Sequence, residues 1–226
     1  MGDPASETTE ASARTDQTDD SVSSRATVLQ AASTAASRLF RAYEAHSRRP
    51  DHDTLFNTLN ALHSLNDRLK KAGTQDFEDL DDFTALKALR NFAHHQDEIT
   101  ANVRMIAWPG DLAFLCLVRR SQVEGAIEAT PSKWRAKTRS ACELVFHWYG
   151  DAVNINPCLF NFMVHAYERL GIAGLRADVE SARAFKASYD FETRHDLPHF
   201  IDGRLSGPVG EIGAVLSALV IDLPDR

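Results

Sequence analysis

The sequence has few cysteines, no long apolar run and no secretory signal, and each of these features argues against a class of protein. Its three cysteines, Cys116, Cys142 and Cys158, stand far apart and form no Cys-x-x-Cys pair, which argues against a disulfide framework or a zinc knuckle. It holds no run of 18 or more apolar residues, so no membrane-spanning segment is expected. The first residues are acidic and hydroxyl-rich, and they do not predict a secretory signal. The expected compartment is therefore a reducing cytoplasm.

Charge is unevenly distributed along the chain. The 226 residues carry a net charge of −7, of which residues 1–24 hold −5. This segment is rich in Ser, Thr, Asp, Glu and Ala and has no aromatic residue. It cannot bury enough apolar surface to offset the entropy of ordering, so we expect a disordered acidic tail. Residues 25–226 carry only −2 and are expected to form a single domain, whose charge argues neither for nor against a nucleic-acid partner.

The pattern of apolar residues predicts a mainly helical protein. Apolar side chains recur every three or four positions from about Arg25 to Pro50, from Asp51 or Asp53 to Gly73, from within 79–82 towards Ile99, and over 157–171. The short connections between the first three segments suit an antiparallel, up-and-down four-helix bundle. The residues from about 102 to 150 are then an insertion before the fourth helix. The residues from about 172 to 226 are a C-terminal extension with extra helices.

Local signals within and after the insertion are less uniform. Trp108-Pro109-Gly110 predicts a break in regular structure, and the apolar run that follows over 112–118 fits either a buried strand or a helix. Residues 131–147 read as a helix, and the segment from Asp151 to Pro157 reads as a loop. A further helix is expected near 175–188, and an apolar segment runs over 212–223.

One short run carries the strongest functional signal. In Arg90-Asn91-Phe92-Ala93-His94-His95, an arginine is followed by a polar residue, and four residues separate Arg90 from His95. Together with the helical setting, this run resembles the motif of the HEPN superfamily. The resemblance covers about 25–100 and 157–171, and it implies a HEPN-like bundle and a metal-independent endoribonuclease without a cofactor. Carried over by position, Arg90, Asn91 and His95 would form the catalytic site, with His94 beside them.

The resemblance also implies a biological setting. HEPN proteins typically dimerise and place two motifs face to face in one cleft, and many are toxins or phage-defence effectors. A homodimer that acts on RNA, with a cognate antitoxin or regulatory protein as a further partner, is therefore expected.

The residue types of the motif suit cleavage of RNA without a metal. The reaction needs the 2′-hydroxyl deprotonated, the 5′-oxygen protonated and the charge on the phosphate stabilised. Histidine transfers protons near neutral pH. Arginine stays cationic and presents a planar fork of donors to phosphate oxygens. Asn91 can orient either partner by hydrogen bonding.

Helix geometry leaves open which histidine acts. On a continuous helix, Arg90 and His94 lie on the same face, one turn apart. Arg90 and His95 lie about 140° apart around the axis. Those two residues therefore meet only if the helix is distorted or a second copy of the chain supplies the partner. The family pattern favours His95, and the geometry favours His94.

Other interpretations of the motif stay open. The four polar residues fit the solvated face of an amphipathic helix whose Leu86, Leu89 and Ala93 point inward. The chain would then be a purely structural helical protein. A third interpretation is a non-catalytic HEPN-like module that binds RNA, nucleotide or a protein partner.

A basic segment at 119–139 is a second candidate for contact with RNA. Its net charge is +4, and an aromatic side chain among the cations suits stacking against a base. The alternative is an ordinary solvated helix face. The candidate RNA-binding residues are Arg119, Arg120, Lys133, Trp134, Arg135, Lys137 and Arg139.

No metal site is expected. Glu192, His195 and His199 surround Pro198 and read as polar loop residues rather than ligands. The glycines at 207, 210 and 213 lack a following Gly-Lys-Ser/Thr and read as turn residues. His147 and His165 read as hydrogen-bonded core histidines, and Cys142 and Cys158 read as small buried hydrophobes.

Overall fold

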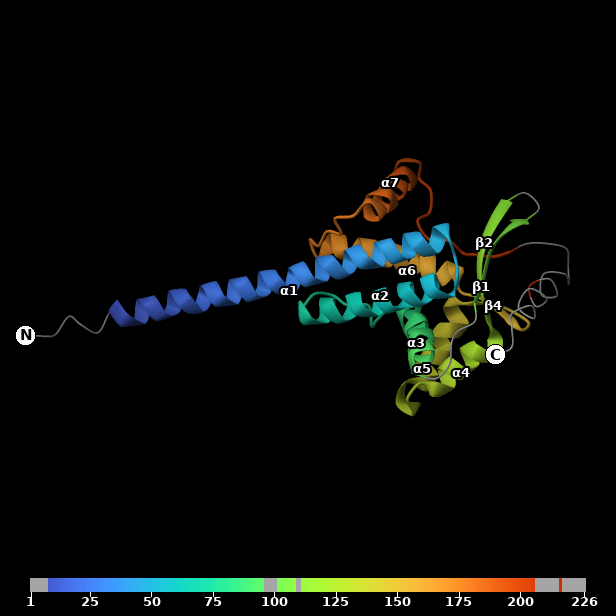
Figure 1. The fold of residues 1–226 in the computed structure, drawn as a ribbon, viewed down its shortest axis with the longest axis horizontal. Helices are drawn as coiled ribbons and strands as arrows, with labels where there is room; N and C mark the ends of the chain where they lie inside the picture. The colour runs from blue at the N-terminus through green and yellow to red at the C-terminus, as the bar shows by residue number, and fades with distance from the viewer. Residues whose placement is uncertain (1–7, 96–100, 109–110, 206–215, 217–226) are drawn as a thin grey trace, which may run out of the picture.

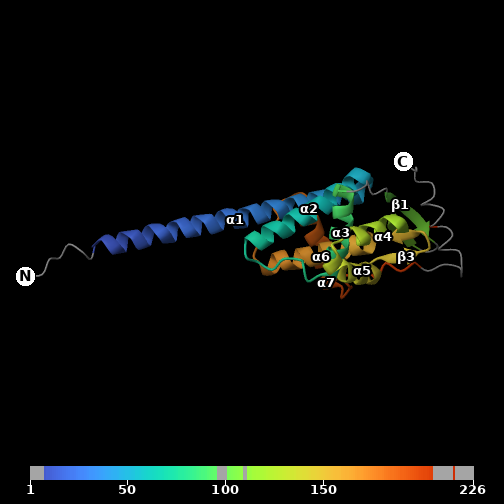
Figure 2. The same ribbon diagram turned by 90° about the horizontal axis from the view of Figure 1, so that it is seen from below.

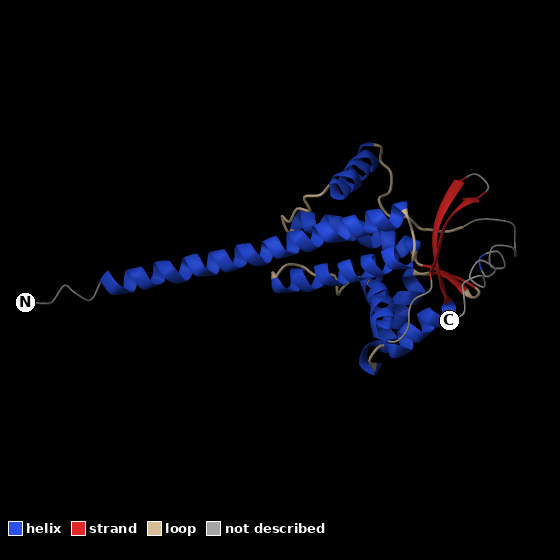
Figure 3. Cartoon of the chain, in the orientation of Figure 1, coloured by secondary structure: helices blue, strands red, loops and turns tan. Residues whose placement is uncertain are grey.

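The computed structural model is mainly helical, with a small antiparallel sheet at one end (Figure 3). It describes residues 8–95, 101–108, 111–205 and 216. For residues 8–23, 101–108 and 111–114 it describes the backbone but not the side chains. The expected mainly α class is confirmed. The HEPN-like bundle stays a prediction.

The first two helices form an antiparallel hairpin. Helix α1 spans Thr8–Arg48, and α2 spans His52–Lys71. The chain reverses around Pro50, where the sequence predicts the end of a helix. Asp51 is the N-cap of α2, because its side chain accepts a hydrogen bond from Thr54 N at 2.7 Å while Thr54 Oγ1 accepts one from Asp51 N. This reciprocal pair satisfies two backbone donors that a helix start otherwise leaves unpaired.

The start of α1 lies within residues 1–24, for which the sequence predicts a disordered acidic tail. The structure places these residues in helix from Thr8 onward, and Figures 1 and 2 both show α1 extending well beyond the end of α2. Residues 5–49 contain neither proline nor glycine. Nothing in their backbone chemistry therefore interrupts the helix that the buried stripe of Ala32, Ala36 and Leu39 establishes further along.

Helix α3, Asp81–His95, lies against α2, α4, α5 and α6. The helices that follow are α4, Arg120–Ala129; α5, Ser132–Val145; α6, Asn156–Ile172; and α7, Glu180–Arg194. The predicted helices over 131–147 and 157–171 correspond to α5 and α6. The helix predicted near 175–188 begins and ends later, as α7.

The sheet lies in and just after the expected insertion. Its strands are β1, Ala101–Trp108; β2, Asp111–Arg119; β3, His147–Tyr149; and β4, Ala152–Asn154. They run in the order β1-β2-β4-β3, with every neighbouring pair antiparallel. The apolar run over 112–118 is therefore a strand. Residues 152–154, expected as part of a loop, are a strand because they pair with both β2 and β3.

Three phenylalanine rings at the centre of the core hold α3 and α6 together. The Phe77 ring lies 5.0 Å from that of Phe162, and the Phe83 ring stacks on Phe162 at 6.0 Å. All three are fully buried. Such buried aromatic pairs contribute about 0.5–1.5 kcal/mol each beyond the area that they bury. They fix the apolar face of α3, so that its polar residues point towards α2 and solvent.

Candidate functional site

Arg90 is the motif residue that the structure holds most firmly. It lies in the last turns of α3, just after the fully buried Leu89. Its Nε donates a hydrogen bond of 3.0 Å to Oδ1 of Asn60 on α2, and its NH1 donates one of 3.2 Å to Oδ1 of Asn91. Two amide oxygens thus fix the guanidinium plane and leave further N–H groups free to bind a ligand.

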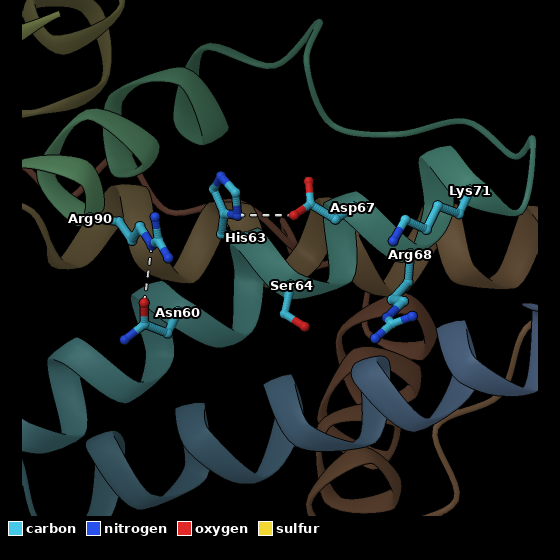
Figure 4. A pocket seen from close by; sticks show the side chains of 7 residues that line it. All are labelled: Asn60, His63, Ser64, Asp67, Arg68, Lys71 and Arg90. Atoms are coloured by element: carbon cyan, nitrogen blue, oxygen red, sulfur yellow. Dashed lines mark hydrogen bonds and ion pairs between the residues drawn. The ribbon is translucent and has the colours of Figure 1, made fainter. Parts of the chain in front are cut away.

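A row of polar side chains on α2 forms the rest of the site. These residues lie at positions i, i+3, i+4, i+7, i+8 and i+11, so they share one face of the helix. Together with Arg90 they line an open pocket of about 240 Å³ (Figure 4). The residues contributed by α2 are Asn60, His63, Ser64, Asp67, Arg68 and Lys71. The lining carries three permanent cations and one carboxylate, so the pocket suits an anion.

His63 lies in this pocket with the features of a proton acceptor. Its Nδ1 faces Oδ2 of Asp67 at 3.4 Å, and the imidazole is 22% exposed. Burial of the ring lowers the pKa of His63 below its ordinary value, and the nearby charges of Arg90 and Lys87 lower it further, whereas Asp67 raises it. The ring is therefore mostly neutral at pH 7. With Nδ1 directed at the carboxylate, Nε2 remains as the nitrogen that accepts a proton.

His94 and His95 do not line this pocket. Both are exposed at the end of α3, and their rings contact each other with centroids 4.7 Å apart. Helix α3 continues as a regular α-helix through His95, so the distortion that would let Arg90 and His95 meet within one chain does not occur. The structure brings together Arg90, Asn91, Asn60 and His63. A shared site with His95 would need a second copy of the chain.

No protein-family model matches the chain, and comparisons with curated proteins and with solved structures find no match either. The site is therefore interpreted from its own geometry. Within the described residues, no cluster of three or more His, Cys, Asp or Glu side chains could hold a metal ion. In the same part of the chain, no helix is both long enough and apolar enough to cross a membrane.

Sequence reasoning missed Asn60, His63 and Asp67. On sequence they belong to the polar face of an amphipathic helix, and nothing local separates them from solvated surface residues. The signal that could have found them is their spacing: His63 and Asp67 are one turn apart, as a histidine and its carboxylate partner would be on a helix. Their position next to Arg90 depends on how α2 and α3 cross, which the periodicity of either helix leaves open.

The basic segment at 119–139 is divided between three elements. Arg119 ends β2, Arg120 begins α4, and the residues from Lys133 onward lie on α5. Several cations are already engaged: Arg120 pairs with Glu124, and Arg135 and Arg139 both pair with Glu128. Lys137 donates to the carbonyl oxygen of Glu78, and Lys133 lies over the half-exposed Trp134 ring. The ion pairs with Glu124 and Glu128 offset part of the positive charge that phosphates would meet.

The remaining sequence candidates have structural roles. All three cysteines are buried, and burial raises the pKa of Cys142 to about 12, so no thiolate nucleophile is available. His199 pairs with Glu192 at 2.8 Å while its ring stacks on Tyr189. His165 lies half-buried, 3.8 Å from Asp82. The glycines at 207, 210 and 213 lie outside the described residues. Of the apolar segment over 212–223, the structure describes only Leu216, which is buried.

Proposed function

We propose that this protein is a metal-independent endoribonuclease whose active site is the Arg90 pocket between α2 and α3. The observation that carries the proposal is the arginine guanidinium, held by Asn60 and Asn91, in the same pocket as the neutral histidine His63. An oriented phosphate-binding cation next to a histidine base supplies two of the three things that the reaction needs without a metal: a proton acceptor and stabilisation of the charge on the phosphate.

The proposed reaction is transesterification of an RNA phosphodiester. Nε2 of His63 takes the proton of the 2′-hydroxyl, and the 2′-oxygen forms a bond to phosphorus as the bond to the 5′-oxygen breaks. The free N–H groups of Arg90 stabilise the extra negative charge on the phosphate. Arg68 and Lys71, further along the pocket, suit the neighbouring phosphates. The products are a 2′,3′-cyclic phosphate and a 5′-hydroxyl.

The departing 5′-oxygen needs a proton, and this is the role proposed for the end of α3. His94 and His95 are exposed and therefore accessible to a second copy of the chain. A homodimer that brings one copy's His95 to the other copy's Arg90 pocket would place an acid opposite His63. That arrangement keeps the role that the HEPN resemblance assigns to His95.

A non-catalytic module is the second candidate function, and the exposed position of His94 and His95 favours it. Without a proton donor the same pocket would bind a phosphate group of RNA or nucleotide without turnover.

A cleavage assay in EDTA separates the two functions. Wild type, Arg90→Lys and His95→Ala are incubated with total RNA, and the 3′ ends of the products are identified by mass spectrometry. Wild type is expected to produce cyclic phosphate ends. Arg90→Lys should be slower because lysine cannot reproduce the planar fork, and His95→Ala should be slower by about 10²-fold or more if it supplies the acid.

Arg194→Lys is the matched control for the arginine change, because Arg194 lies at the end of α7 and outside the pocket. RNA that stays intact with wild type, while the protein still binds it, would replace the nuclease proposal with the binding module.

A further inference from the structure

A second pocket lies away from Arg90, where α4 and α5 meet the edge strand β3. It has a volume of about 290 Å³. Its lining residues are Arg120, Glu124, Ile127, Arg139, Glu143 and Trp148. It shares no lining residue with the Arg90 pocket. Gly125 of the same helix α4 lies against the ring of Phe92, which is about 200° around α3 from Arg90.

A flat π system forms one wall of this pocket. The guanidinium carbon of Arg120 lies 5.7 Å from the centre of the Trp148 ring, over its face. The indole Nε1 donates to the carbonyl oxygen of Cys142 at 3.2 Å, and Nε of Arg120 donates to Glu124 at 2.8 Å. Both planes are therefore held in place before any ligand arrives. A planar arginine on an aromatic ring is a surface on which an unpaired base stacks.

The charges of the pocket cancel. The lining holds two arginines, Arg120 and Arg139, and two glutamates, Glu124 and Glu143, so it suits a neutral planar ligand with both donors and acceptors better than it suits a phosphate. Arg139 keeps free N–H donors beyond the one that binds Glu128 at 2.7 Å. Within the described residues, the exposed carboxylate of Glu143 has no hydrogen bond or ion pair, so both of its oxygens are available as acceptors.

We propose that this pocket binds a guanine base, stacked on Arg120 and Trp148. Guanine alone among the four RNA bases presents two adjacent donors, N1–H and N2–H, which match the two oxygens of one carboxylate. It also presents the acceptors O6 and N7, which an arginine reads well. Glu143 accepts the two donors, and Arg139 donates to the acceptors. The shared chemistry is the guanine base, whether it belongs to a free nucleotide or to an unpaired position in RNA.

Calorimetric titration tests this site without any reference to cleavage. The probes are GMP, AMP and UMP, and two hexanucleotides of 2′-O-methyluridine in which one central position is 2′-O-methylated G or A, so that no free 2′-hydroxyl is present for cleavage. Guanine is expected to bind roughly tenfold or more tightly than adenine, as for other bidentate base contacts. If only the guanine hexanucleotide shows the preference, the source is RNA. If GMP shows it equally, a free nucleotide suffices.

Variants connect the preference to the pocket. Glu143→Gln should abolish the preference for guanine because the amide replaces one acceptor with a donor, and Trp148→Phe should weaken all bases together. Glu180→Gln is the matched control, since Glu180 is an exposed carboxylate on α7 that pairs with Arg183. Equal affinity for guanine and adenine in wild type, or a guanine preference that survives Glu143→Gln, would overturn the assignment. Neither result bears on the Arg90 pocket.

Discussion

At the scale of single residues, the site depends on how His63 and Arg90 influence each other. Burial of the ring lowers the pKa of the His63 imidazole, and the charge of the nearby Arg90 guanidinium acts in the same direction. A neutral histidine beside a fixed cation is a ready proton acceptor for a substrate that brings its own negative charge. Asp67 opposes the shift and at the same time fixes the orientation of the ring.

The lowered pKa of His63 predicts the pH dependence of cleavage. Only the neutral ring can act as the base, so on the acidic side of the pH profile the rate should rise with pH as His63 loses its proton. Because the folded pKa lies below the ordinary value of about 6.5, the midpoint of the rise should lie below pH 6.5. Single-turnover rates of cleavage from pH 4.5 to 8 measure it. Asp67→Asn should lower the midpoint further, and a profile that is flat over this range would argue against a histidine base.

At the scale of helices and loops, the connection between α2 and α3 holds the two halves of the site in register. Phe77 N donates to Oδ1 of the buried Asn66 at 2.8 Å. Arg169 of α6 binds both carboxylate oxygens of Asp79 and the carbonyl oxygen of Asp76. The loop over 72–80 is thereby tied to α2 and to α6, which sets where α3 begins and how it crosses α2.

Glu78 is the most heavily used acceptor of this loop. Its Oε1 accepts hydrogen bonds from Lys70 of α2 at 2.6 Å, from Lys87 of α3 at 2.7 Å and from Asn66. Burial alone would raise the pKa of Glu78, but the hydrogen bonds and charges of the two lysines outweigh it and hold the pKa at about 2. One carboxylate thus connects both helices of the proposed site.

Glu78→Gln is expected to loosen the crossing of α2 and α3. The amide loses the negative charge that both lysines bind, so the midpoint of urea unfolding should fall modestly and cleavage should fall further as His63 and Arg90 separate. Because the pKa of Glu78 is lowered in the folded state, its contribution is present above the unfolded pKa of about 4.3 and is lost as pH falls through about 2. The difference in stability between wild type and Glu78→Gln should therefore be constant from pH 5 to 8. A variant as active and as stable as wild type would contradict this role.

The sequence predicted elements well where one face of a long helix is apolar. The stripe from Leu55 to Leu69 marks α2, and Asp51, which caps it, was one of the two predicted starts of this helix. The sequence did not predict β3 and β4, because each strand has only three residues, which are too few for an alternating pattern to be recognised. The motif residue Arg90 does line a pocket, with Asn91 hydrogen-bonded to its guanidinium, but His63 belongs to another helix and only the tertiary crossing brings it there.

At the scale of the whole molecule, His46 should make stability depend on acidity. It is fully buried where α1 meets α2, with Nδ1 3.2 Å from Thr54 Oγ1. Burial lowers the pKa of His46 to about 4, against the opposing charge of Asp51. The unfolded chain takes up a proton near pH 6.5 and the folded one only near pH 4. The stabilisation is therefore present above about pH 6.5 and is lost as pH falls through about 4.

Chemical unfolding at pH 7.5 and at pH 4.5 measures this dependence. Each unit of the lowered pKa corresponds to about 1.4 kcal/mol of unfolding free energy. The unfolding free energy of wild type should fall from pH 7.5 to pH 4.5. That of His46→Gln should be lower than wild type at pH 7.5 but should fall clearly less. His195→Gln, which changes an exposed histidine, should behave as wild type. Equal losses in wild type and His46→Gln would show that other groups cause the acid sensitivity.

The proposed active site makes one histidine of α2 essential, and its removal is the most direct test. Single-turnover cleavage of RNA in EDTA at pH 7 is measured for wild type, His63→Asn and His195→Asn. The proposal predicts a loss of about 10²–10⁴-fold for His63→Asn and wild-type rates for His195→Asn, with RNA binding retained in both. A His63→Asn protein that cleaves at the wild-type rate would contradict the assignment of His63 as the base.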